Sequence, residues 1–412
     1  MLSISTMQPI PRLSTLLAGS ALLATIGIAP PALAGATVKI NDDTSLNIGA
    51  GLRTSYTDLD NGAPNGTSPS KNFAVENARL YTSGEFGKIF KATLNFNASG
   101  NTGSTNGNSD SLRLIDGIAR FEFDPAANLW IGRMLPPSDR ANLYGPFFTM
   151  GWAFPGVAQN YPSATAGRDT GAMLWGDPFQ GKLSYSVGVF NGHNRQAGLS
   201  NQTDSLLYAG RLEWNIWDPQ TGYYRDGTYW GSKELLSIAI AGFSQSNGVG
   251  TAAAPGGLHI WSIDGIFEKK LSGGLVPTLE LIRYRYSLGA LDCNSGEGAA
   301  GGIGQSACAG AGGDNVGGQV AGRAYTLTGA LLFPDKVGWG QFQPFIRLQR
   351  FYRDVSQTTN KSGELGLNYI IKGFNAKVSA VFTKFDDTRL PLLTPGAPTG
   401  AHQFVVGVQL QY

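Results

Sequence analysis

The chain has 412 residues, of which 31 are lysine or arginine and 29 are aspartate or glutamate, giving a formal net charge of +2. This balance argues against a nucleic-acid or anionic-surface partner, because such partners select strongly basic chains. Glycine is abundant, with 57 residues, and aromatic residues make up 11% of the chain, whereas only 15% of residues are charged. This composition favours extended strands at a membrane interface over a helical domain.

Residues 1–34 are predicted to be a secretory signal peptide. One arginine is their only charged residue, an apolar stretch covers 13–28, and Ala32-Leu33-Ala34 fits the small-x-small rule for cleavage. An uncleaved membrane anchor is the alternative, but two prolines end the apolar stretch. We therefore expect cleavage before Gly35 and a single mature domain, 35–412. Beyond the signal, no apolar run approaches the ~18 residues that a spanning helix needs.

Strand-like alternation recurs along the rest of the chain. Leu94 and Phe96, for example, share a face opposite Asn95 and Asn97, because successive strand side chains point to opposite faces. About sixteen such segments have a length near the ten residues of a tilted membrane strand. The segments are 45–57, 73–84, 89–99, 111–123, 127–134, 168–176, 182–191, 205–215, 234–245, 258–270, 275–287, 321–333, 341–353, 361–371, 374–385 and 402–412. Two of them, 73–84 and 275–287, fit least well, because their apolar residues fall on both faces.

The links between the segments alternate in length. Long links follow odd-numbered segments, although 354–360 is shorter, and short links follow even-numbered ones. Link 216–233 breaks the pattern, because it is long where a short turn is expected, and the sequence offers no explanation. The sequence therefore predicts an all-β fold, a transmembrane antiparallel β-barrel of about 16 strands with long extracellular loops and short periplasmic turns.

The last segment is the most clearly amphipathic. Phe404, Val406, Val408, Leu410 and Tyr412 share one face, and the opposite face is mostly small or polar. As the sixteenth strand it should pair with the first and remove both free edges of the sheet. Its two end aromatics, Phe404 and Tyr412, are the predicted assembly signal, with Tyr412 at the periplasmic rim. The outer-membrane assembly machinery is expected to recognise it there.

Five motifs in the chain point to a known family. They are Asp116–Phe121 (DGIARF), Leu129–Met134 (LWIGRM) followed by two prolines, Gly167–Gly176 (GRDTGAMLWG), Tyr185–Gly192 (YSVGVFNG) and Gly366–Tyr369 (GLNY). Together they resemble the phosphate-selective porin family of the O/P type. The resemblance implies a trimeric, sixteen-stranded barrel in the outer membrane of a Gram-negative cell, with passive solute flow. It also implies that the loop after the fifth strand, 135–167, folds into the lumen and narrows it.

Basic residues on the polar faces of the strands and on this loop are the candidates for lining the pore and binding anions. They are Lys91, Arg120, Arg133, Arg140, Arg168 and Arg211. The candidate contacts of the inward loop are Asp139, Tyr144, Trp152 and Asp169. The loop departs from the family, whose anion selectivity is associated with lysines there, because 135–167 has no lysine and only Arg140 as a basic residue. Two roles stay open for Arg168: binding anions beside Arg133, or bracing the loop through Asp139 or Asp169.

Catalysis, a cofactor and a metal site are not expected. The three histidines, His193, His259 and His402, lie near predicted strand ends or loops, and no glycine-rich phosphate cradle precedes a helix. Cys293 and Cys308 flank a glycine run within one long loop. In an oxidising compartment we expect them to form a disulfide, with free thiols as the alternative.

Three functions are compatible with these patterns. The first is an outer-membrane porin for small hydrophilic solutes, in particular inorganic anions such as phosphate. The second is a porin for neutral solutes such as sugars, if the aromatic rings of 135–167 supply stacking surfaces instead of merely packing that loop. The third is a structural or surface-recognition barrel, or a secreted β-sandwich adhesin. The expected partners are solutes, outer-membrane lipid and further copies of the chain.

Overall fold

The structure is a computed structural model, and it describes residues 35–98, 112–158, 167–192, 205–250, 255–289, 315–316, 319–354, 357, 359–385 and 400–412. The predicted signal peptide, 1–34, lies outside the described residues, as do Cys293, Cys308 and His193. No helix among the described residues is long and apolar enough to cross a membrane.

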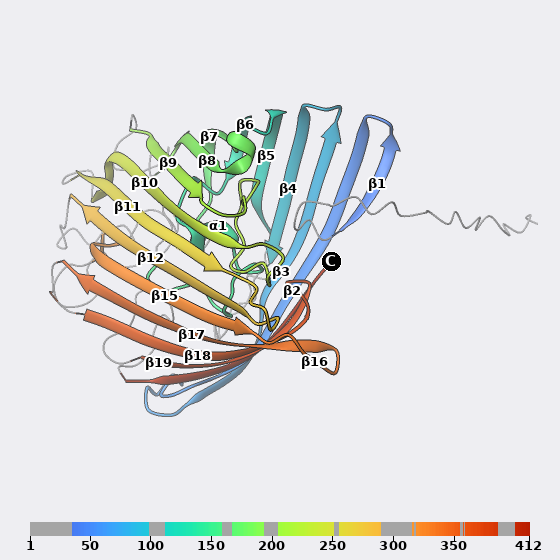
Figure 1. The fold of residues 1–412 in the computed structure, drawn as a ribbon. Coiled ribbons are helices and arrows are strands. Elements are labelled where there is room, and N and C mark those ends of the chain that lie inside the picture. Colours follow the sequence, from blue (N-terminus) through green and yellow to red (C-terminus); the bar gives the residue numbers. More distant parts are fainter. Residues whose placement is uncertain are drawn as a thin grey trace, which may run out of the picture. The chain divides into compact units, whose positions relative to one another are not determined.

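Sixteen antiparallel strands close into a barrel (Figure 1). They are β2 (Thr44–Leu59), β3 (Ser70–Phe86), β4 (Phe90–Ala98), β5 (Arg113–Asp124), β6 (Ala127–Met134), β7 (Asp169–Gly176), β8 (Leu183–Phe190), β9 (Leu207–Asn215), β10 (Leu235–Gly250), β11 (Pro255–Glu268), β12 (Val276–Leu288), β15 (Gly322–Leu332), β17 (Gly340–Arg353), β18 (Thr359–Lys372), β19 (Ala376–Phe385) and β20 (His402–Gln411). Each of the sixteen predicted segments overlaps one of these strands, so the prediction of their number and order is confirmed.

The remaining elements are short. β1 (Ala36–Asn41) pairs with the start of β2, and β16 (Lys336–Val337) pairs with the start of β17. β13 (Asn315–Val316) and β14 (Gln319–Val320) pair with each other. The two helical elements are α1 (Arg140–Tyr144) and η1 (Phe179–Gly181).

The last strand closes the barrel on the first, as predicted. β20 pairs with β2 from Leu59 opposite Gln403 to Gly51 opposite Gln411. The seam continues one residue further, because Tyr412 N donates to Ala50 O at 2.8 Å. Both sheet edges are thereby hydrogen-bonded, which a strand surrounded by lipid requires.

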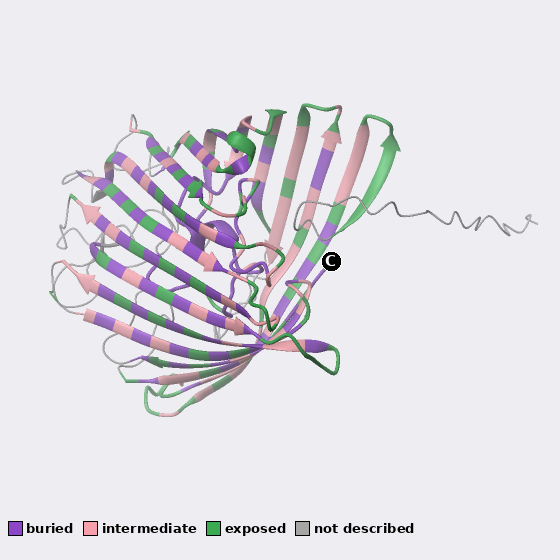
Figure 2. Cartoon of the chain, in the orientation of Figure 1, coloured by how far each residue is buried: buried purple, intermediate pink, exposed green. Residues whose placement is uncertain are grey.

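The two faces of the barrel wall differ in burial, and Figure 2 shows the resulting alternation along most strands. On β20 the outer face is apolar, and its Leu410 is 53% exposed. The neighbouring Gln409 points to the other face and is fully buried. The polar face therefore points into a filled lumen and the apolar face points outward. This is the arrangement expected of strands that stand in lipid.

A β-bulge explains why segment 73–84 fitted the alternation poorly. The pairing of β2 with β3 shifts between Arg53 opposite Asn77 and Thr54 opposite Val75, which leaves Glu76 as an extra residue. An extra residue reverses which positions face outward. Apolar residues with odd numbers therefore face outward before Glu76, and those with even numbers do so after it. The lumen-facing residues of the second half include Arg79.

The poor fit of segment 275–287 to the alternation has a different cause. On β12 the lumen face carries Ile282, Tyr284 and Tyr286, each with 1% exposure or less, while Leu279 and Leu281 face outward. Apolar residues fall on both faces because the lumen at this point is filled by protein and not by water. The segments that fill it form the candidate site.

Candidate functional site

Two segments of the chain fold into the lumen. The first, here called the inward loop, is 135–158, which follows β6 and contains α1. The second, the inward turn, is 216–234, the unexpectedly long link between β9 and β10. The two segments meet, because Tyr223 Oη donates to Leu135 O at 2.7 Å and Gly227 N donates to Phe148 O at 2.8 Å. The long link is thus explained as a second inward segment, entering from the end of the barrel that carries the short turns.

The backbone of the inward loop is held through its carbonyl groups. Seven consecutive carbonyl oxygens, from Phe147 to Ala153, each accept a hydrogen bond from the barrel wall or from the inward turn. The donors are Gln409 Nε2 to Phe147, Gly227 N to Phe148, Lys377 Nζ to Thr149 and Gly151, Asn368 Nδ2 to Met150, Arg53 Nη2 to Trp152, and Arg347 Nη1 to Ala153. The wall donors come from β2, β17, β18, β19 and β20, so the loop is docked against the closing seam of the barrel.

Glycines in the wall make room for the aromatic rings of the loop. A Cβ atom on Gly51 of β2 would lie 2.7 Å from the ring of Phe147, and one on Gly407 of β20 would lie 2.5 Å from the ring of Trp152. Trp152 also stacks on the Arg53 guanidinium, with 4.0 Å between Cζ and the ring centroid. These rings are therefore buried in the wall and serve to pack the loop.

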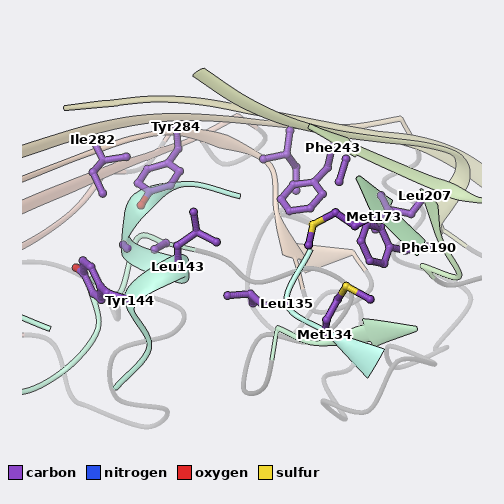
Figure 3. Close-up of a cluster of buried hydrophobic side chains, with 14 of the residues drawn as sticks. Met134, Leu135, Leu143, Tyr144, Met173, Phe190, Leu207, Phe243, Ile282 and Tyr284 are labelled. Carbon is purple, nitrogen blue, oxygen red and sulfur yellow. The ribbon is translucent and has the colours of Figure 1, made fainter. Parts of the chain in front are cut away.

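The other end of the inward loop packs against β12. Leu143 and Tyr144 of α1 face Ile282 and Tyr284 (Figure 3), and all four belong to the largest buried apolar group of the lumen. Asp139 caps α1, accepting from Asn142 N at 3.3 Å, and it also accepts from Tyr284 Oη at 2.8 Å. The predicted loop contacts Asp139, Tyr144 and Trp152 thus all lie in the interface between loop and wall.

A buried network of ion pairs joins both inward segments to β9, β11 and β12. Arg211 pairs with Asp264 and with Glu213, the latter at 2.9 Å, and Arg225 of the inward turn also pairs with Glu213 at 2.9 Å. Arg140 of the inward loop lies 3.5 Å from Glu280. Arg140 and Arg211, predicted to bind anions, are 0% and 6% exposed and are paired with carboxylates. The structure therefore places them in the docking network.

A second polar group, here called the donor belt, crosses β2, β3, β4 and β5 on the lumen face. Arg53 Nη1 donates to Asn77 Oδ1 at 3.1 Å, and Asn97 Oδ1 accepts from Asn77 at 3.4 Å and from Arg79 Nε at 3.3 Å. The arginines orient the amides, because a guanidinium has only donors to offer. Because Asn97 accepts through its Oδ1, its NH2 group can donate to a solute in the lumen.

The donor belt ends in an ion pair. Asp116 accepts from Asn95 at 2.9 Å and from Arg168 Nε at 3.1 Å. Tyr81 and Tyr224 lie within electrostatic range of Arg168. The belt therefore brings three guanidiniums, those of Arg53, Arg79 and Arg168, to one wall, where Asp116 pairs with Arg168 and Glu76 lies near Arg53. A set rich in donors and positive charge favours an anionic solute.

The remaining predicted site residues are spread over the barrel. Lys91 pairs with Glu85 at 3.3 Å and Glu122 at 3.0 Å, and Arg120 lies 3.5 Å from Glu122. Both basic residues are therefore neutralised near the end of the barrel that carries the short turns. Asp169 accepts from Thr170 N at 2.7 Å and Gly192 N at 2.5 Å, so it holds the backbone at the start of β7 and the end of β8.

Arg133 and Arg168 require corrections. The register places Arg133 opposite Gly117 and Thr170, on the outer face with Ile131, so it does not line the lumen. Alternation along the strand already places Arg133 on the face of Leu129 and Ile131, so the sequence itself argues against the predicted role. Arg168 pairs with Asp116, whereas the predicted brace named Asp139 or Asp169.

Sequence reasoning missed four lumen cations, Arg53, Arg79, Arg347 and Lys377, as members of the site. Arg79 lay in the segment whose alternation the bulge reversed. The others sit on correctly predicted strands, but alternation alone does not show which polar-face residues meet the loop. Arg347 and Lys377 each donate to a loop carbonyl group more than 190 positions away in the chain, and Arg347 also pairs with Glu364 at 3.2 Å.

The inward turn contains a carboxyl group that responds to pH. Burial raises the pKa of Asp226 from its ordinary value of 3.8 to about 6, against the attraction of Arg140, Lys233 and Arg225, while Glu268 repels it. A raised folded pKa means that protonation favours the docked state. That stabilisation is complete below about pH 4 and is lost as the pH rises through about 6.

We therefore expect the inward turn to be docked more firmly at about pH 5 than at about pH 7.5, by roughly 1.4 kcal/mol. Limited proteolysis of the folded barrel at the two pH values, with an acid-tolerant protease, measures this. Asp226→Asn removes the titrating group and should give the same cleavage rate at both. Equal pH dependence in the wild type and this variant would assign the effect to another group.

Comparison with known proteins agrees with this geometry. Residues 46–223 match the family model described as phosphate-selective porin O and P. Residues 46–223, which are less than half of the chain, therefore carry the pattern of that family. The match includes the donor belt and the inward loop. Among curated protein sequences, none matches this porin.

Solved porin structures share the fold at low sequence identity. OmpF of Salmonella typhi, in complex with daunomycin, is 10% identical, with a TM-score of 0.57 over 92% of this chain and 100% of that one. An anion-selective porin from Comamonas acidovorans is 11% identical, with a TM-score of 0.54 over 90% of this chain and 100% of that one. OmpT of Vibrio cholerae is 11% identical, with a TM-score of 0.54 over 92% of this chain and 100% of that one. Family and fold are those of an outer-membrane channel.

Proposed function

We propose that this porin passes small anions, inorganic phosphate among them, along the donor belt. The observation that carries the proposal is the grouping of Arg53, Arg79 and Arg168 on one wall, where Asp116 and Glu76 offset two of the three positive charges and one remains. The family description, phosphate-selective porin, supports the same direction. The buried aromatic rings of the inward loop weigh against a sugar channel, because rings held in the wall offer no stacking surface to a solute.

The expected preference for anions is mild. An anion about 8 Å from one positive charge gains roughly 0.5 kcal/mol in water, about a twofold preference. Asp116 offsets the charge of Arg168. Glu76 lies near Arg53, which is also tied to the loop carbonyl of Trp152. Arg79 is therefore the residue that attracts the passing ion.

Replacing Arg79 by glutamine should lower the anion-to-cation permeability ratio about twofold. The reversal potential of single channels in a planar bilayer, under a potassium chloride gradient, measures this ratio. Arg283→Gln is the matched control, because it removes an equal charge from the outer face of β12 and should leave the ratio unchanged. Cation selectivity or no selectivity in the wild type would disprove the anion proposal.

We also propose that the mature porin starts at Gly35 after signal cleavage and works as a trimer. A trimer form is described for the V. cholerae OmpT structure, which has the same fold. Native mass spectrometry of the porin extracted from outer membranes tests both points at once. A complex whose mass is not three times that of 35–412 would contradict the proposal.

A further inference from the structure

A row of basic residues lies on the outside of the barrel, at the extracellular ends of five neighbouring strands. The outer basic row consists of Arg283, Arg285, Arg323, Arg350, Lys361 and Lys384. The strand register makes them neighbours: Arg285 is opposite Arg323, and Arg350 is opposite Lys361. The row is a continuous patch of one sign across β12, β15, β17, β18 and β19.

The row begins where the apolar outer face ends. On β12, Leu279 and Leu281 are 47% and 53% exposed, and Arg283 is the next residue on the same face. On β17, Ile346 and Leu348 are followed in the same way by Arg350. An outward-facing arginine costs about 2–4 kcal/mol at the bilayer midplane but only about 0–1 near the interface. The row therefore marks the level of the lipid headgroups.

Partners within the protein are unevenly distributed along the row, and Lys361 and Lys384 are among the members that have them. Arg285 pairs with Asp354 at 2.8 Å. In the part of the chain that the structure describes, no carboxylate forms an ion pair with Arg283, Arg323 or Arg350. Like charges directly opposite one another in a sheet are destabilising. An arrangement of this kind calls for an external anion at the same level.

Aromatic rings hold the guanidiniums of the row in place. Arg283 lies over Trp261 at 5.5 Å and over Tyr325 at 5.7 Å, measured from Cζ to the ring centroid. Arg350 lies over Tyr352 at 4.5 Å, and Arg323 lies over the same ring at 5.1 Å. A guanidinium stacked on a ring keeps its N–H edges free, and those edges suit the paired oxygens of a phosphate group.

We propose that the outer basic row binds the phosphorylated headgroup of a glycolipid in the extracellular leaflet. The acyl chains of such a lipid would cover the apolar face directly below the row, and its phosphates would neutralise Arg283, Arg323 and Arg350. Continuity between the apolar face and the basic row favours a lipid over a free anion. The proposal depends on the barrel and its orientation, and is independent of which solute passes through the lumen.

Titration of the purified porin in neutral detergent with a fluorescent bis-phosphorylated lipid A tests the proposal. The combined variant Arg283→Gln, Arg323→Gln and Arg350→Gln should bind about a hundredfold more weakly. Binding should fall with added salt and should be lost for the dephosphorylated lipid. Unchanged heat-modifiable gel mobility and single-channel conductance would show that the variant is folded.

Lys336→Gln with Lys372→Gln is the matched control, because these exposed lysines lie at the opposite, periplasmic end of the barrel. This control should bind the lipid as the wild type does. Equal binding by the triple variant, or by the dephosphorylated lipid, would overturn the proposal. Full displacement of the lipid by millimolar inorganic phosphate would also overturn it, since the row would then be a site for free anions.

Discussion

Replacing Gly407 by valine is expected to release the inward loop from the barrel wall. A Cβ atom at this position would lie 2.5 Å from the Trp152 ring, so the ring has to leave its place against β20. Loss of a buried tryptophan contact is worth about 3–5 kcal/mol, which changes the ratio of docked to released loop more than a hundredfold. Single-channel conductance should rise, and proteases should cleave within 135–167.

Trp152→Ala gives the same test without a change in a strand. This variant removes the ring and leaves β20 intact, so it should also raise conductance and loop cleavage. Gly363→Ala is the control, because its added Cβ would meet only Leu348, at an ordinary 3.8 Å. A Trp152→Ala porin with wild-type conductance and a protease-resistant loop would show that the carbonyl hydrogen bonds suffice to dock the loop.

Glu213→Gln should strongly destabilise the interior of the barrel. Glu213 is 1% exposed and accepts from both Arg211 and Arg225 at 2.9 Å. Arg211 keeps Asp264 as a partner, whereas Arg225 loses its only ion pair among the described residues. Leaving a buried charge without its partner typically costs about 3–5 kcal/mol. A denaturant titration of the purified porin measures the loss, and cleavage of the inward turn should increase with it.

Two further variants test whether the unpaired charge of Arg225 causes the loss of stability. Arg225→Met, combined with Glu213→Gln, removes the orphaned charge and should recover part of the stability. Glu234→Gln breaks an exposed pair with Lys269, in which the side chains are 50% and 43% exposed. Exposed pairs contribute about 1 kcal/mol or less. If Glu213→Gln cost no more than Glu234→Gln, the buried network would not be what holds the inward turn.

The strands of this porin could be predicted from the sequence because each one carries its own signal. Alternation along β20 needs only neighbouring residues, since lipid and lumen impose opposite demands on successive side chains. The same reasoning went wrong where one residue changed the local geometry. The bulge at Glu76 reversed the alternation on β3 and hid the lumen position of Arg79.

The site was predicted less well, because its residues come together only in the folded chain. Arg140 and Arg211 are basic residues at positions where they could line the pore. In the folded chain, however, Glu280 neutralises Arg140 and Glu213 neutralises Arg211. Lys377 and Arg347 lie on the lumen face of the wall, but both donate hydrogen bonds to carbonyl groups of the inward loop. A guanidinium binds a solute only if no partner within the protein has already satisfied it, and that depends on contacts between distant segments.

The sequence by itself determined the class of protein: a β-barrel with sixteen amphipathic strands, a closing terminal strand and the motifs of a porin family. These features are local, because period-two alternation and turn formation depend on residues that are adjacent in the sequence. Only the tertiary structure decided what fills the lumen. It showed the inward turn, the seven docked carbonyls and the division of the arginines between a buried network and the donor belt. The physical reason is that burial and pairing set the role of a charge, and both arise only when remote segments pack together.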